Sequence, residues 1–168
     1  RGMGMAICMQ GSGIANVDTA SVELRLEDFG YYTLMIGATD MGTGCDTIFA
    51  QMVADGMSCP MEKIMVHGVD TDISPYDPGS YASASTYVTG MAVVKACEHM
   101  HELILDEAAR VLDCPRETLE FDGTIITAEC GKSISLDDLA IGLVAGPQTH
   151  QLVATASHGS PISPPPFM

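Results

Sequence analysis

The sequence predicts an α+β domain with a mixed or antiparallel sheet and about three helices packed mainly on one face. Two observations support this prediction. Apolar or alternating segments of strand length recur along the chain, and three segments show the 3.6-residue periodicity of a helix. The chain has 168 residues, 46% of them hydrophobic, which is enough for one core. We therefore expect residues 1–168 to form a single domain.

Three strands are expected before the first helix. They cover Met3–Met9, Thr19–Leu26 and Tyr31–Ile36, with turns at residues 11–13 and 28–30 between them. An amphipathic helix follows over Thr47–Asp55, and a fourth strand over Met61–Val66.

The longest helix is expected from Ser83 or Ser85 to Leu112, because apolar side chains mark one face and charged side chains the other. Asp113–Pro115 ends it. Leu119–Phe121 and Thr124–Ala128 then predict a hairpin.

The last elements are a short helix and a strand. Ser135, with Asp138 three residues later, resembles a capping box with Asp in place of the usual Glu, and opens a helix to Val144. Gln151–Ala156 is expected to be the final strand.

The chain is strongly acidic, with 22 Asp and Glu against 7 Lys and Arg and a net charge of −15. This balance argues against nucleic acid and anionic membrane surfaces as partners, because both are bound mainly by Lys and Arg. No apolar run reaches the about 18 residues of a membrane span. The six cysteines include no Cys-x-x-Cys pair and are interpreted as reduced thiols of a cytoplasmic protein.

A glycine-rich turn over residues 37–47 joins the third strand to the first helix. The first N–H groups of a helix are unpaired and carry partial positive charge, and Gly42 and Gly44 have no Cβ to block a ligand. The turn therefore predicts an anion site, with phosphate as the first ligand to consider. The alternative is a tight connection whose glycines only permit positive φ.

A second polar turn precedes the long helix, after a loop containing two prolines and a glycine in residues 75–79. Hydroxyl groups there can donate hydrogen bonds, and small side chains leave room for a flat, polar ligand. These residues are Ser80, Ala82, Ser83, Ala84 and Ser85. Two such turns in one small domain predict a ligand held from two sides.

Four segments in a fixed order carry a resemblance: Gly37–Gly44, Val69–Asp72, Pro75–Ser83 and Tyr87–Val93. Their order resembles the molybdenum-binding large subunit of the xanthine dehydrogenase and aldehyde oxidase family, across essentially the whole chain. In that family, two turns at these places contact the molybdopterin cofactor.

The resemblance implies two sets of cofactor contacts in this chain. The first set is Met41, Gly42, Thr43 and Gly44, and the second is Ser80, Ala82, Ser83, Ala84 and Ser85. Two positions depart from the family pattern. Thr43 stands where the family usually has Gln, and Ala84 stands where many bacterial members have Arg.

The chain is thus expected to be a fragment of a molybdenum hydroxylase that acts on a purine, an N-heterocycle or an aldehyde. The implied cofactor is molybdopterin, with the cytosine dinucleotide form as one option. Iron–sulfur clusters and FAD would lie on other segments or subunits, which would be its partners together with the rest of the large subunit. The family's catalytic Glu has no counterpart here, so we assign no catalytic residue or metal ligand and expect the isolated fragment to be inactive.

Two other interpretations remain open: a non-catalytic α+β binding or interaction domain, and a homologue that has lost cofactor binding. Other sites are less well supported. Asp70–Ser74 begins like a calcium-binding loop, but Pro75 replaces the glycine that such a loop needs. Cys97 and His101 lie one helical turn apart, and core packing explains them better than zinc.

Overall fold

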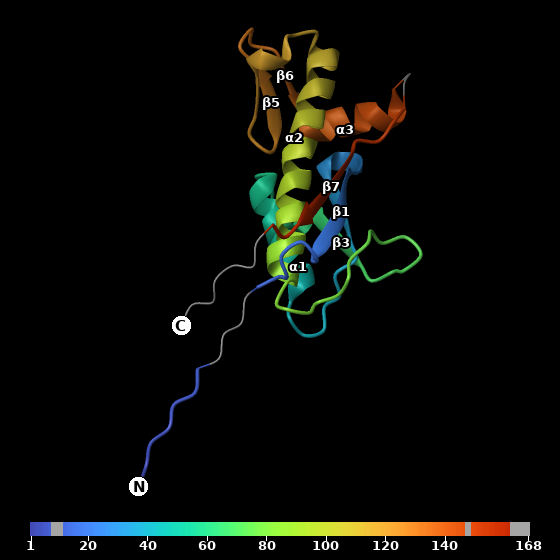
Figure 1. Ribbon diagram of the computed structural model, residues 1–168. Helices are drawn as coiled ribbons and strands as arrows, with labels where there is room; N and C mark the ends of the chain where they lie inside the picture. The colour runs from blue at the N-terminus through green and yellow to red at the C-terminus, as the bar shows by residue number, and fades with distance from the viewer. Residues whose placement is uncertain (8–11, 147–148, 162–168) are drawn as a thin grey trace.

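Two sheets and three α-helices make up the fold of the computed structural model, which describes residues 1–7, 12–146 and 149–161 (Figure 1). The larger sheet has the strand order β3-β2-β1-β7. Its strands are β1 (Thr19–Leu26), β2 (Tyr32–Ile36), β3 (Ile64–Gly68) and β7 (Val153–Gly159). β1 pairs antiparallel with β2 and β7, and β2 pairs parallel with β3. The predicted α+β class with a mixed sheet is confirmed.

A second sheet lies apart from the first and contains three antiparallel strands in the order β4-β5-β6. These strands are β4 (Leu119–Phe121), β5 (Ile125–Ala128) and β6 (Ser133–Ser135). The hairpin predicted after the long helix is therefore present, but it does not join the larger sheet. The 23-residue helix before it explains why, because a helix of this length carries the chain about 34 Å.

The helices are α1 (Cys45–Gly56), α2 (Gly90–Leu112) and α3 (Leu136–Ala145). α1 packs against β3, α2 packs against β1 and β7, and the two helices touch each other, so they cover the same face of the larger sheet. A π-helical turn, Ser85–Thr89, runs directly into α2, which agrees with the predicted start at Ser85. α3 packs instead against the turn at residues 28–30.

One hydrophobic cluster joins these parts of the fold. It contains Leu24 and Leu34 of the larger sheet, Ile126 of the smaller sheet, and buried side chains of all three helices. All five residues of β2 are buried, and the strand lies between β1 and β3 inside the sheet. The alternating burial of β1 is the pattern that its sequence predicts.

Some predicted element bounds were wrong. Residues 3–7 form no strand and are exposed, while residues 8 and 9 of that segment and residue 11 of the turn lie outside the described residues. Met61–Lys63 is a 3₁₀ turn, closed by Lys63 N–H donating to Pro60 O at 3.0 Å, so β3 begins at Ile64. The last strand extends to Gly159 because its residues pair with β1 as far as Thr19.

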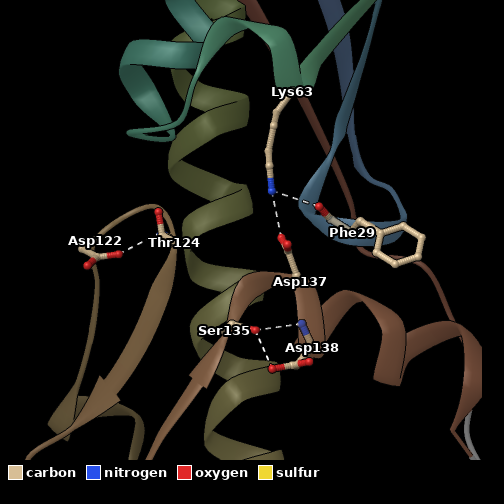
Figure 2. A network of polar contacts seen from close by, with 7 residues as sticks. All are labelled: Phe29, Lys63, Asp122, Thr124, Ser135, Asp137 and Asp138. Atoms are coloured by element: carbon tan, nitrogen blue, oxygen red, sulfur yellow. Dashed lines mark hydrogen bonds and ion pairs between the residues drawn. The ribbon is translucent and has the colours of Figure 1, made fainter.

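A polar network stabilises the edge of the sheet where β2 and β3 begin (Figure 2). Lys63 Nζ donates to Asp137 Oδ1 at 2.8 Å and to Phe29 O at 3.0 Å. Ser135 caps α3, because its Oγ accepts from the N–H of Asp138 at 3.0 Å, which confirms the predicted cap. This network connects elements distant in sequence and lies at the opposite edge from the two polar turns.

Candidate functional site

The two turns singled out by the sequence lie side by side at one end of the fold. We call residues 37–44 the first loop and residues 69–84 the second loop. They follow β2 and β3, which are parallel neighbours, so both loops leave the same edge of the sheet (Figure 1, blue-green and green). A Cβ added at Gly37 would lie 2.3 Å from Pro75 O, so the loop backbones are in direct contact.

The first loop is organised by Asp40. Its Oδ1 accepts from the N–H of Gly42 at 2.8 Å and from the N–H of Gly44 at 3.1 Å. These bonds hold the pKa of Asp40 below its usual value. Two backbone N–H groups of the glycine-rich turn are therefore already bound to a carboxylate of the chain.

The outer side of the first loop is open. Met41 is 68% exposed, and Gly42 and Thr43 are exposed as well. A Cβ added at Gly42 or Gly44 would meet nothing within 4 Å, so a ligand can approach this backbone closely. Both glycines have positive φ, +103° and +72°, which favours glycine at these positions.

The second loop is organised by Asp77 in a similar way. Its Oδ1 accepts from the N–H of Gly79 at 2.8 Å, and its Oδ2 accepts from Thr89 Oγ1 at 3.2 Å. Ala82 and Ser83 have φ of 50° and 55°, an uncommon conformation for residues other than glycine. The N–H of Gly13 donates to Ala82 O at 2.8 Å and so holds the loop from the N-terminal side.

The residues of the second loop that are predicted to contact the cofactor differ in their exposure. Ser83 is exposed, Ser80, Ala82 and Ser85 are half-buried, and Ala84 is only 5% exposed. The Ala84 side chain packs in a small apolar cluster with Ala20 and Val88. It therefore supports the loop from below and does not belong to the exposed surface.

Asp18 lies beneath the second loop, and sequence reasoning missed it. It is 1% exposed, and its Oδ2 accepts from the N–H of Ile14 at 2.5 Å. Tyr81 hydrogen-bonds to Asp18, which raises the pKa of the Tyr81 hydroxyl. Nothing in the sequence signals this role, because an Asp just before a strand is an ordinary turn residue.

The charge around the loops is negative. Residues 37–46 and 69–86 contain no Lys, Arg or His, but they include Asp40, Asp46, Asp70, Asp72 and Asp77. A phosphate at this surface would need cations from another segment. The hydroxyl groups and exposed backbone are better suited to a neutral, polar ligand.

Two findings concern other kinds of site. Across residues 1–7, 12–146 and 149–161, no cluster of three or more His, Cys, Asp or Glu side chains could hold a metal ion. Over the same ranges, no helix combines the length and apolar character needed to span a bilayer.

Known proteins resemble this chain over almost its whole length. The family model described as "Molybdopterin cofactor-binding domain" matches residues 1–167. A "Probable hypoxanthine oxidase XdhD" of Escherichia coli K12 is 33% identical over 95% of this chain and 17% of its own length. A "Putative xanthine dehydrogenase molybdenum-binding subunit XdhA" of the same organism is 33% identical over 99% of this chain and 23% of its own.

A solved structure shows the same fold. The reconstituted CO dehydrogenase from Oligotropha carboxidovorans superposes with a TM-score of 0.81 at 24% identity, over 92% of this chain and 21% of that chain. The chain thus spans only about a fifth of the proteins that it matches. The family model covers both loops, the long helix and the last strand, so the chain belongs to the molybdopterin cofactor-binding domain family, as the resemblance to xanthine dehydrogenase large subunits predicted.

Proposed function

We propose that the first and second loops form part of the molybdopterin-binding surface of a larger, molybdenum-dependent oxidoreductase. One observation carries the proposal: in a chain of this family, the two loops expected to bind the cofactor are in backbone contact at Gly37 and Pro75. Within that protein, residues 1–168 would act as one domain of the molybdopterin-binding region.

We propose that exposed or half-buried residues of both loops make the contacts. In the first loop these are Met41, Gly42, Thr43 and Gly44, and in the second Ser80, Ala82, Ser83 and Ser85, with Ala84 as a support. The residues fit the neutral, hydrogen-bonding part of a pterin, because Gly42, Thr43 and Ser83 are exposed and Ser80 and Ser85 are partly exposed. They do not fit a phosphate, because Asp40 holds two of the N–H donors and no cation lies in either loop.

Large apolar side chains near the loops support a partner surface at this end. Met41, Ile73 and Tyr76 are 68%, 57% and 66% exposed, although side chains of this size usually lie inside a protein. We expect the cofactor and the remaining large-subunit segments to cover them. Iron–sulfur clusters and FAD would lie on those segments or on other subunits.

The bound cofactor supplies the redox chemistry, by which the parent enzyme would hydroxylate a purine, an N-heterocycle or an aldehyde. The names of the relatives, a hypoxanthine oxidase and a xanthine dehydrogenase subunit, support a purine. This chain's part is to position the pterin, whether in its simple or its cytosine dinucleotide form. The isolated chain would have no turnover, and we place the parent enzyme in the cytoplasm.

The proposal is tested by cofactor loading of the full-length parent protein. Thr43→Glu places a carboxylate on the first loop at an exposed residue, and Ser133→Glu places the same group at the exposed first residue of β6, remote from both loops. We expect Thr43→Glu to lower molybdenum and pterin content at least tenfold and Ser133→Glu to leave both unchanged. Full loading of a folded Thr43→Glu protein would overturn the proposed contact.

A further inference from the structure

Two cysteines that are 16 residues apart in the sequence meet at the end of α2. Cys114 follows the helix, after Asp113 has turned the chain with φ of 50°. Cys130 lies in the turn between β5 and β6. Their Sγ atoms are 3.2 Å apart. Sequence reasoning missed this pair because its spacing matches no thiol motif.

Both cysteines are held in place by their surroundings. The N–H of Cys114 donates to Ala109 O at 3.2 Å, and the N–H of Glu129 donates to Thr118 O at 3.0 Å. Lys132 Nζ donates to Leu112 O at 2.6 Å, which ties the β5–β6 turn to the end of α2. A disulfide needs an S–S distance of about 2.05 Å, so the sulfurs must approach by only about 1.1 Å.

The two thiols have different roles in this contact. The N–H of Lys132 donates to the Cys130 sulfur, and this bond together with the hydrogen bond between the two sulfurs lowers the pKa of Cys130. The pKa of Cys114 is raised, chiefly by its hydrogen bond with Cys130. Cys130 is exposed, so an oxidant can reach it. It therefore has the character of an attacking thiolate, and Cys114 that of a resolving thiol.

The other described cysteines differ. Cys45 and Cys97 are buried, and Cys59 is half-buried with its pKa raised by burial. Cys59 therefore serves as a control thiol in the same chain.

We propose that Cys114 and Cys130 form a reversible disulfide by exchange with a small-molecule disulfide such as oxidised glutathione. The Cys130 thiolate attacks one glutathione sulfur, which forms a mixed disulfide and releases one glutathione thiolate. Cys114 then loses its proton to solvent and attacks Cys130 Sγ, which forms the protein disulfide and releases the second glutathione thiolate. Two protein thiols are oxidised, and one glutathione disulfide is reduced to two thiols.

The bond would fasten the smaller sheet to the end of α2. The two loops lie at the other end of this helix, so the disulfide would form without contact with them (Figure 1). Intracellular disulfides are mostly transient and redox-linked, which agrees with a pair that is partly open to solvent.

Peptide mapping of the full-length parent protein tests the proposal. Cleavage after Arg110, Arg116 and Lys132 gives the peptides 111–116 and 117–132, and each holds one cysteine. The native protein is equilibrated with reduced and oxidised glutathione, alkylated and digested without reduction. We expect a linked peptide pair whose mass is the sum of the two less two hydrogen atoms, and we expect dithiothreitol to remove it.

Variants make the result specific. Cys130→Ser and Cys114→Ser should abolish the linked pair, whereas Cys59→Ser should retain it. Cys114→Ser should instead accumulate the mixed disulfide on Cys130. If the native protein forms no linked pair in fully oxidised glutathione, or forms it only after denaturation, the proposal is wrong.

Discussion

At the scale of single residues, Gly37 sets how closely the two loops approach. Its place at the end of an apolar strand indicated only a turn, and its packing partner was not visible in the sequence. The partner is the backbone of Pro75 and Asp77, 38 and 40 residues later, and a Cβ at Gly37 would lie 2.3 Å from Pro75 O. Backbone atoms cannot move aside as a flexible side chain can, so the chain needs glycine here.

We therefore expect Gly37→Ala to separate the loops. The clash should cost about 1–3 kcal/mol of folding free energy, as overpacked cores do. In the parent protein, molybdenum content should fall as well. Denaturant unfolding and metal analysis measure the two effects.

Gly142→Ala is the matched control for this change. Gly142 is exposed within α3, and an added Cβ would meet nothing within 4 Å. This substitution should raise stability by about 0.5–1 kcal/mol, because alanine favours helix. A Gly37→Ala protein as stable and as well loaded as wild type would contradict the role given to Gly37.

His101 gives a prediction about pH. It lies on the α2 face beside the Phe121 ring, at 5.0 Å between centroids, and burial lowers its pKa. Below about pH 6.5 the unfolded chain binds a proton that the folded chain resists, so this group makes stability fall as pH drops through that value. His101→Gln should weaken the fall in the urea midpoint between about pH 7 and pH 5. An unchanged pH dependence would show that His101 does not contribute.

At the scale of elements, the sequence predicted features that depend on neighbouring residues, but it did not predict which strands pair. The capping pair Ser135 and Asp138, the strand Thr19–Leu26 and the end of α2 at Leu112 were predicted from neighbouring residues and agree with the structure. The second sheet and the bounds of the last strand depend on which strand each segment pairs with. A single sequence does not show that partner.

The N-cap of α3 is the element whose contribution is easiest to measure. Ser135 Oγ accepts from the N–H of Asp138 and donates to its Oδ2 at 2.6 Å. Ser135→Ala should cost about 1 kcal/mol. Ser133→Ala, in the same short strand and exposed, should change stability by less than about 0.5 kcal/mol. Equal effects of the two substitutions in denaturant unfolding would show that the cap contributes little.

At the scale of the whole molecule, the candidate site depends on two parallel strands. Sequence motifs predicted both loops, but their contact follows from the parallel pairing of β2 and β3, which places their ends at one edge. The motifs also predicted an anion site at the glycine-rich turn, but the N–H groups of Gly42 and Gly44 are bound within the chain. Asp40 lies only two and four residues from these glycines and accepts both hydrogen bonds. The contact is between residues close in sequence, but it depends on a side-chain conformation that the motif does not specify.

The acidic character of the chain also argues against a phosphate site in the loops. With a net charge of −15 and no cation in either loop, the surface repels anions. We therefore expect the loops to contact the pterin and expect residues of other segments to bind its phosphate.

The central claim is that both loops contact the molybdopterin cofactor, and an experimental structure of the cofactor-loaded parent protein tests it most directly. We predict pterin atoms within about 3.5 Å of polar atoms in the first loop and in the second loop. A cofactor that leaves one of the two loops without a contact, or whose phosphate lies on the N–H groups of Gly42 and Gly44 in place of Asp40, would contradict this account.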